Sequence, residues 1–218
     1  MTDARGRVEA ICVVSRLTPD PGSVGTTAID KRPVDGPVRI GTTGVYADIQ
    51  ADRAHHGGAD QAVYVLDAAE AAHWERELGR VIPAGGLGEN IRATGLRVDD
   101  LEIGARLRLG TVLLEVTAPR TPCATFERWM GVDGFRQAYH ERGRTGAYCR
   151  VIEPGQAQAG DELVVEHAPG HGVTVAACYA ATRDREVARA LHDWSSASGV
   201  ALHREIVRRN ARLLGDGA

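Results

Sequence analysis

Short apolar runs separated by glycine and proline fill residues 7–167, and this pattern predicts a chain built mostly of β-strands. Two runs are strongest: residues 8–15 and 61–66 are rich in β-branched side chains and carry little polarity, which is typical of buried strands. Gly110 separates two further runs that predict a hairpin or a bent strand. The other expected strands are residues 37–41, 44–49, 104–109, 111–116, 147–152 and 161–166.

Few helices are expected among these strands. Ala68–Leu78 has helical composition, with Asp67 as its N-cap and Glu70 at the third helical position. Residues 124–129 predict the first turns of another helix. Strands this dense, with only a few short helices, favour a mainly β fold with peripheral helices, arranged as an antiparallel barrel or rolled sheet.

The composition changes at residues 167–172, where proline and glycine predict a linker. Beyond it, apolar residues recur at helical spacing in residues 173–181, 184–193 and 200–214. The pattern therefore predicts a barrel domain over residues 1–167 and a three-helix segment over residues 168–218. A segment this short has too small a core to be secure alone, so we expect it to pack on the barrel or on a second subunit, as in a homodimer.

Charge and hydropathy exclude several classes of function. The formal net charge of -3 argues against general nucleic-acid binding, because there is no basic excess to displace counterions. No apolar run approaches the roughly 18 residues that span a bilayer. The first seven residues lack the apolar core of a signal peptide, so we expect a cytoplasmic protein without membrane association.

Of the four cysteines, Cys123 alone has a local sequence that suggests reactivity. It ends the segment Pro119-Arg-Thr-Pro-Cys123, between an expected strand and an expected helix. Both the helix N-terminus and the cation of Arg120 favour thiolate over thiol. Cys123 is thus a candidate nucleophile or soft-metal ligand, and the alternative is a small buried apolar residue. Cys12, Cys149 and Cys178 lie in apolar strand or helix patterns and form no C-x-x-C pair, so neither disulfides nor a four-thiolate zinc site is expected.

Three other features are candidates for binding. Lys31 is the one lysine beside 25 arginines, and lysine differs from arginine as a compact point charge. His55 and His56 precede two glycines in a loop whose backbone can approach a ligand closely. A second glycine-rich loop carries Glu89 and Asn90, which can bind polar groups of a heterocycle. Each feature alone also fits an ordinary exposed loop or turn.

Seven short motifs follow one another along the chain. They are Lys31-Arg-Pro-Val34, Ala51-Asp-Arg53, His56-Gly-Gly58, Asp60-Gln-Ala-Val-Tyr64, Gly88-Glu-Asn-Ile91, Ile103-Gly104 and Pro119-Arg-Thr-Pro-Cys123. In this order they resemble the MOSC family, the domains related to the C-terminal region of molybdenum-cofactor sulfurase, over roughly residues 6–167. The helical tail is similar to the appendage of stand-alone bacterial members such as the hydroxylaminopurine-resistance proteins. Two features depart from the family pattern: Ala47 stands where glycine is expected, and the loop at residues 18–28 is unfamiliar.

The resemblance implies a rolled β-barrel that binds molybdenum cofactor (molybdopterin), with Cys123 as the molybdenum ligand. It implies a reductase of N-hydroxylated compounds that receives electrons from a separate redox protein. The alternatives are a persulfide sulfur carrier, a non-catalytic cofactor carrier, and a molybdenum-independent enzyme of specialised metabolism using the same pocket. The implied catalytic residues are Cys123 and His56, and the implied cofactor-binding residues are Lys31, Arg53, His55, Glu89, Asn90 and Arg120.

Overall fold

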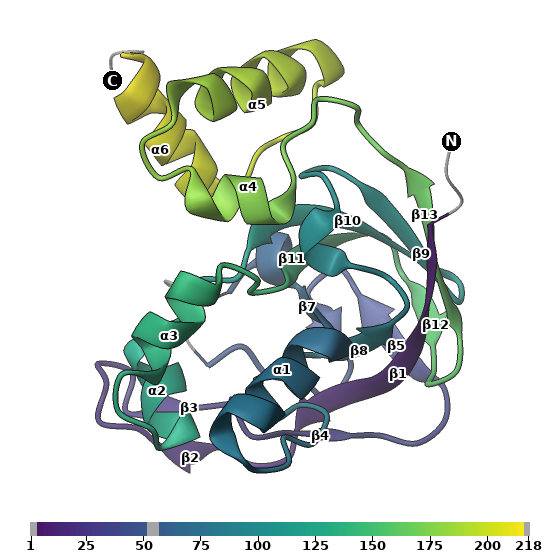
Figure 1. Cartoon of the computed structure of the whole chain (residues 1–218). Coiled ribbons are helices and arrows are strands. Elements are labelled where there is room, and N and C mark those ends of the chain that lie inside the picture. Colours follow the sequence, from purple (N-terminus) through teal and green to yellow (C-terminus); the bar gives the residue numbers. More distant parts are fainter. Residues whose placement is uncertain (1–3, 52–56, 216–218) are drawn as a thin grey trace.

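A closed β-barrel forms the centre of the computed structural model, which describes residues 4–51 and 57–215 (Figure 1). Eight strands join in the order β13-β9-β10-β11-β7-β8-β1-β4, and an additional pairing of β13 with β1 closes seven of them into a barrel. All neighbours are antiparallel except β7 and β8. The strands are β1 (Arg5–Val14), β4 (Lys31–Pro33), β7 (Val63–Asp67), β8 (Ile91–Thr94), β9 (Arg106–Leu109), β10 (Val112–Pro119), β11 (Ala147–Glu153) and β13 (Glu162–His167).

Two small sheets flank the barrel. One contains β5 (Val38–Gly41), β6 (Gly44–Val45) and β12 (Gly155–Ala157), and the other is the hairpin of β2 (Thr18–Pro19) and β3 (Thr26–Thr27). The strand expected over residues 44–49 ends at Val45. Ala47 adopts a positive φ of 68°, a left-handed conformation that turns the chain out of an extended path.

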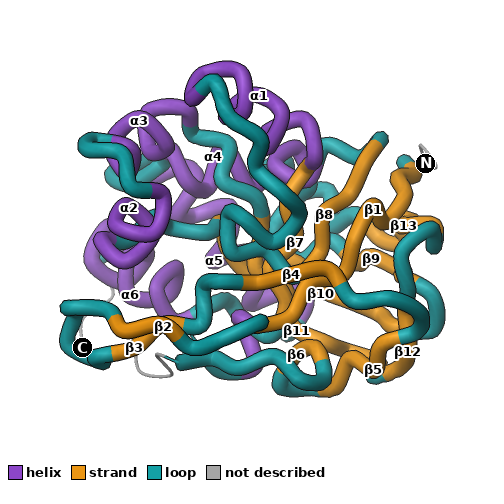
Figure 2. The backbone as a smooth tube through the Cα atoms, turned by 90° about the horizontal axis from the view of Figure 1, so that it is seen from below, coloured by secondary structure: helices purple, strands orange, loops and turns teal. Residues whose placement is uncertain are grey.

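Helices cover one side of the barrel and leave the other side to strands (Figure 2). The hairpin of β9 and β10, the helix Ala68–Leu78 and its Asp67 cap are all confirmed. The α-helices are α1 (Ala68–Leu78), α2 (Ala124–Met130), α3 (Phe135–Arg142), α4 (Val175–Ala180), α5 (Arg185–Ser198) and α6 (Arg204–Leu214), and the short 3-10 turns are η1 (Ala59–Gln61) and η2 (Val98–Asp100).

Two apolar clusters hold these layers together. The first fills the barrel and continues to Leu191 and Ile206 of the C-terminal helices. The second lies between β7 and the helices α1, α2 and α3, and it is aromatic, with Trp74 stacked on Tyr139 at 5.4 Å between ring centroids. The second cluster supports the segment that carries Cys123, because Phe126 of α2 belongs to it.

The C-terminal helices pack on the barrel, one of the two arrangements expected from the sequence. Trp194 of α5 lies so close to Gly104 that a Cβ there would approach its ring to 2.2 Å. Gly104 also has a φ of +88°. Both the closeness of Trp194 and the positive φ therefore require glycine at this position. The mainly β fold with a barrel and a helical tail is therefore confirmed. Within the described residues, none of the helices has the length and apolarity needed to cross a membrane.

Candidate active site

The strand-to-helix junction after β10 presents Cys123 in a pocket of about 380 Å³. Cys123 is the N-cap of α2, its side chain is half-buried, and it forms no disulfide. Its carbonyl oxygen accepts a hydrogen bond from the Glu127 N–H at 3.2 Å, which ties the residue to the first turn of the helix. The thiol therefore lies on a supported backbone and faces a cavity, as the sequence predicted for a functional cysteine.

Arg120 lies buried beneath this junction. Its guanidinium carbon is 3.8 Å from the centroid of the Phe126 ring and 5.7–5.8 Å from the rings of Tyr139 and Tyr64. Such faces stabilise a cation, but Nη1 has no hydrogen-bond partner within the described part of the chain. No described carboxylate forms an ion pair with Arg120, so a buried positive charge borders the pocket. Arg120 and Arg128 both interact electrostatically with Cys123.

Lys31 also lines the pocket, but its charge is balanced within the protein. Its Nζ forms an ion pair with Asp48. Asn90 Nδ2 donates to Asp48 Oδ2 at 2.8 Å, and Asn90 Oδ1 accepts from the Tyr64 N–H at 3.1 Å. Burial lowers the pKa of Lys31, and Asp48 opposes this change. Lys31 and Asn90 are both predicted binding residues, and they lie far apart in the sequence. In the structure both contact Asp48.

Asp48 was not assigned a role from the sequence. It follows Ala47 in the turn that departs from the family pattern, and Val14 N–H donates to its Oδ1 at 2.9 Å. Its position directly after an unusual turn was the one sequence signal for a role in the site. Its partners Lys31 and Asn90 are 17 and 42 residues away in the sequence, so their contacts were not predictable.

The structure gives Glu89 a different role from the predicted ligand contact. Its carboxylate accepts hydrogen bonds from the N–H groups of Gly85 and Leu87, at 2.9 and 3.0 Å. Arg92 Nε donates to the same group at 2.8 Å, and the Glu89 side chain has no exposed surface. The glycine-rich loop turns around this carboxylate, and contact of Glu89 with a heterocycle stays a prediction. Arg53, His55 and His56 lie outside the described residues, and their predicted roles stay predictions.

The hairpin of β2 and β3 forms another wall of the pocket. This is the loop that the sequence left unfamiliar, and Thr26, Thr27 and Ile29 line the cavity from it. Asp20 fixes it to α2 by accepting hydrogen bonds from Arg128 Nε at 2.9 Å and from Thr125 Oγ1 at 3.0 Å. The hydrogen bond from Arg128 holds the pKa of Asp20 below its usual range.

Comparisons with known proteins match most of the chain. A family model described as the MOSC domain matches residues 52–164. The uncharacterized protein YflK of Bacillus subtilis is 34% identical over 149 residues, which are 68% of this chain and 67% of YflK. A Gibberella moniliformis protein named as a reductase is 32% identical over 148 residues, but these are only 26% of that protein. The crystal structure of YiiM from Geobacillus stearothermophilus aligns with a TM-score of 0.75 and 27% identity, covering 96% of this chain and 99% of that one.

Proposed function

The chain belongs to the MOSC domain family, and from this we propose that it is a molybdenum-cofactor-dependent oxidoreductase that reduces N-hydroxylated compounds. The family is linked to reductase or sulfurase activity associated with molybdenum cofactor. Of these two activities we favour the reductase, because the Gibberella relative is named as a reductase.

One observation carries the proposal: a half-buried thiol shares its pocket with a buried arginine that has no described carboxylate partner. Thiolate is a soft ligand of the kind that transition metals accept. A buried guanidinium without a carboxylate partner is costly, and an anionic group bound in the pocket would supply the balancing charge. Cys123 and Arg120 therefore fit a cofactor that combines a soft metal with a phosphate.

Each residue of the pocket has a part in this proposal. The bound cofactor supplies the two-electron chemistry at the metal. Cys123 Sγ would hold the metal and Arg120 would orient the organic part, while Asn90, hydrogen-bonded to Asp48, Tyr64 and Cys12, would shape the pocket wall. Reduction of an N-hydroxylamine consumes two electrons and two protons and releases an amine and water, and the electrons come from a separate redox protein. Lys31 lines the same pocket and is held there by its ion pair with Asp48.

Sulfur transfer is the second candidate, and it uses the same thiol. A persulfide on Cys123 would lie in the same pocket of about 380 Å³. Burial raises the pKa of the other thiols, Cys12, Cys149 and Cys178. They are therefore poor sulfur carriers, since the thiolate is the reactive form.

The test is turnover of an N-hydroxylated purine or amidine by the purified protein and by Cys123→Ala, with a chemical reductant supplying the two electrons. We expect loss of turnover by at least about 10³-fold, since removing a group that acts in the chemical step has effects of this size or larger. Cys149→Ala, a buried barrel position, is the matched control and should keep its rate. Full activity in Cys123→Ala would refute the reductase proposal. A gain of one sulfur on Cys123 by mass spectrometry, without bound molybdenum, would favour sulfur transfer instead.

A further inference from the structure

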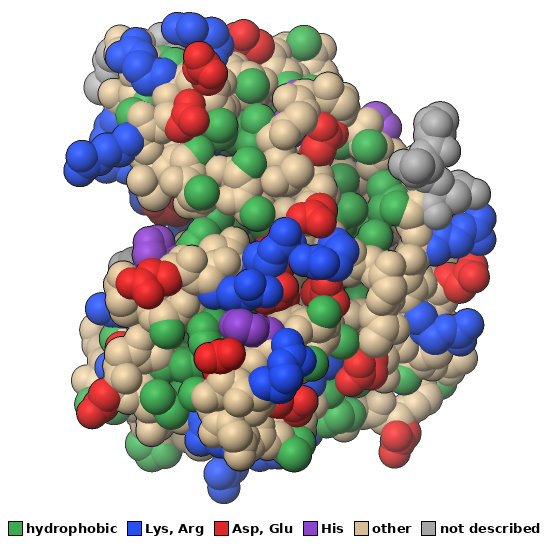
Figure 3. All heavy atoms as spheres, viewed as in Figure 1, with side chains coloured by type: hydrophobic (Ala, Val, Ile, Leu, Met, Phe, Trp, Pro, Cys, Tyr) green, Lys and Arg blue, Asp and Glu red, His purple; other side chains and the backbone are tan. Residues whose placement is uncertain are grey.

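A second cleft, of about 820 Å³, opens between the barrel and the C-terminal helices. The space-filling view shows this face hollowed between the C-terminal helices above and α3 below, with basic side chains on the upper edge (Figure 3). Four arginines of α6 line it: Arg204, Arg208, Arg209 and Arg212. We call it the arginine cleft.

The arginine cleft adjoins the thiol pocket. Gln61, Thr121 and Tyr148 line both cavities, and Thr121 precedes Cys123 by two positions. Pro119, at the end of β10, lies on the arginine-cleft side. The segment that presents the thiol is therefore a wall between the two cavities, and one ligand could reach both.

The positive charge of α6 is concentrated on the cleft. Arg204, Arg208 and Arg212 are spaced four residues apart, so they share one helix face. Like charges at this spacing destabilise an isolated helix. Glu205 lies 2.9 Å from Arg208 and 3.9 Å from Arg204. No described carboxylate forms an ion pair with Arg212, so Arg212 brings positive charge to the lining of the cleft.

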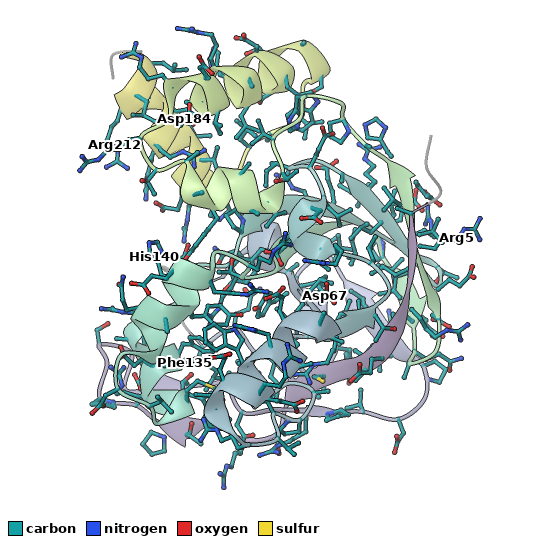
Figure 4. The ribbon with its side chains drawn as sticks, viewed as in Figure 1. Arg5, Asp67, Phe135, His140, Asp184 and Arg212 are labelled. Atoms are coloured by element: carbon teal, nitrogen blue, oxygen red, sulfur yellow. The ribbon has the colours of Figure 1, made fainter. Side chains whose placement is uncertain are left out.

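Arg209 adds a cation that the fold holds in place. Its Nη1 donates to the Cys178 carbonyl oxygen at 2.8 Å. Its Nε is buried and has no hydrogen-bond partner among the described residues. Opposite, His140 of α3 lies 2.6 Å from the Tyr179 hydroxyl, and Figure 4 shows His140 and Arg212 on the two sides of the gap. Among the described residues, the lining therefore offers several donors and one carboxylate, that of Glu205.

We propose that the arginine cleft binds the phosphate of a phosphorylated substrate, whose N-hydroxylated end lies in the thiol pocket. Arginine is suited to phosphate because its planar fork matches the phosphate oxygens. The cleft is larger than one phosphate requires, so it has room for a phosphorylated sugar, as in a nucleotide. Exposed arginines suit a ligand that exchanges in each turnover, whereas the buried Arg120 suits a resident group. This inference rests on the proposed function for the reacting end of the ligand.

Binding is tested with inorganic pyrophosphate and purified protein by isothermal titration calorimetry. We expect the double variant Arg208→Gln/Arg212→Gln to bind it at least about tenfold more weakly, because each lost charge-assisted hydrogen bond is a strong one. Arg189→Gln, an exposed arginine of α5 outside the cleft, is the matched control and should bind as the wild type does. Both variants should keep the wild-type melting temperature. Absence of binding, or equal binding by the double variant, would overturn the proposal.

A kinetic arm separates substrate phosphate from cofactor phosphate. An N-hydroxylated nucleoside is compared with its 5′-monophosphate, and the double variant should raise KM about tenfold for the monophosphate and leave the nucleoside unchanged. Molybdenum and pterin content should equal that of the wild type. Loss of either from the double variant would assign the cleft to the cofactor and overturn the substrate assignment. Because Cys123→Ala should still bind pyrophosphate, failure of the proposed reductase activity remains distinguishable from failure of the cleft.

Discussion

Arg120 and Lys31 are both buried cations beside Cys123, but their charges are balanced differently. Lys31 pairs with Asp48, whereas Arg120 rests on aromatic faces and pairs with no described carboxylate. Their presence near the thiol was predictable from the order of the motifs. The sequence did not show which of the two cations lacks a carboxylate partner. That depends on Asp48, to which the sequence analysis gave no role. At the scale of single residues, Arg120 is the cation of this pocket that has no described carboxylate partner, which is why we propose it as the phosphate contact.

Ala47 is a strained position, and relieving it should stabilise the protein. A left-handed conformation costs a residue with a Cβ about 1–2 kcal/mol, while glycine loses about 0.5–1 kcal/mol more backbone entropy on folding. We therefore expect Ala47→Gly to raise the free energy of unfolding by roughly 0.5–1 kcal/mol in urea denaturation. The exposed Ala197 of α5 is the control, where glycine should destabilise by about 1 kcal/mol. A loss of stability in Ala47→Gly would show that the turn carries no strain.

Asp99 predicts a pH dependence of stability. Burial raises the pKa of Asp99 from 3.8 to about 6, although its Oδ1 accepts hydrogen bonds from the Thr145 and Gly146 N–H groups. The folded state thus binds a proton that the unfolded state has released. The contribution of Asp99 to stability is therefore greatest below about pH 4 and falls as the pH rises toward 6.

Asp99→Asn should remove this fall, because asparagine keeps an acceptor but does not ionise. We expect the free energy of unfolding of the variant, relative to that of the wild type, to rise by up to about 3 kcal/mol between pH 4 and pH 6. Above pH 6 the difference should stay constant. Urea denaturation at a series of pH values measures it, with Asp133→Asn as an exposed control. If the stability difference between Asp99→Asn and the wild type did not change with pH, Asp99 would not be the source of the pH dependence.

At the scale of elements, the strongly patterned segments were predicted and the weakly patterned ones were not. The apolar run at residues 61–66 became β7, and Ala68–Leu78 matched α1 at both ends. Helix α3 was not predicted, because most of its side chains are polar and only Phe135 and Tyr139 are buried. Those two residues, four apart, bury one narrow stripe against the aromatic cluster, which is a weak periodic signal.

The glycine-rich loop shows that a polar side chain in such a sequence can have a structural role. A tight loop leaves backbone N–H groups without partners, and buried ones must be satisfied. Glu89 meets this need from inside the loop. A carboxylate within a glycine-rich sequence looks the same whether it accepts from a ligand or from its own backbone, so only the structure could decide.

The hairpin of β2 and β3 should control access to Cys123. Each of its strands has only two residues, so its position depends on the contacts of Asp20 with Arg128 and Thr125. We expect Asp20→Ala to increase the rate of Cys123 alkylation by iodoacetamide severalfold, because the hairpin then loses its hydrogen bonds to α2. Asp133→Ala, on the loop between α2 and α3, is the control. An unchanged alkylation rate would show that the hairpin does not limit access.

At the scale of the whole molecule, the helical tail completes a surface that the barrel alone lacks. The tail was predicted to pack on the barrel or on a second subunit, and it packs on the barrel through Trp194 and Ile206. This contact places α6 across from α3 and beside the thiol segment (Figure 1). The predicted homodimer and the redox partner stay predictions. The thiol pocket and the arginine cleft lie side by side, so together they suit a ligand with one end in each.

The most direct test of the central claim is elemental and pterin analysis of the purified wild-type protein beside Cys123→Ala. Our account predicts close to one molybdenum and one pterin per wild-type chain, and a strongly reduced molybdenum content in Cys123→Ala with its fold intact by circular dichroism. A wild-type protein that carries neither molybdenum nor pterin after production in a host that makes the cofactor would contradict it.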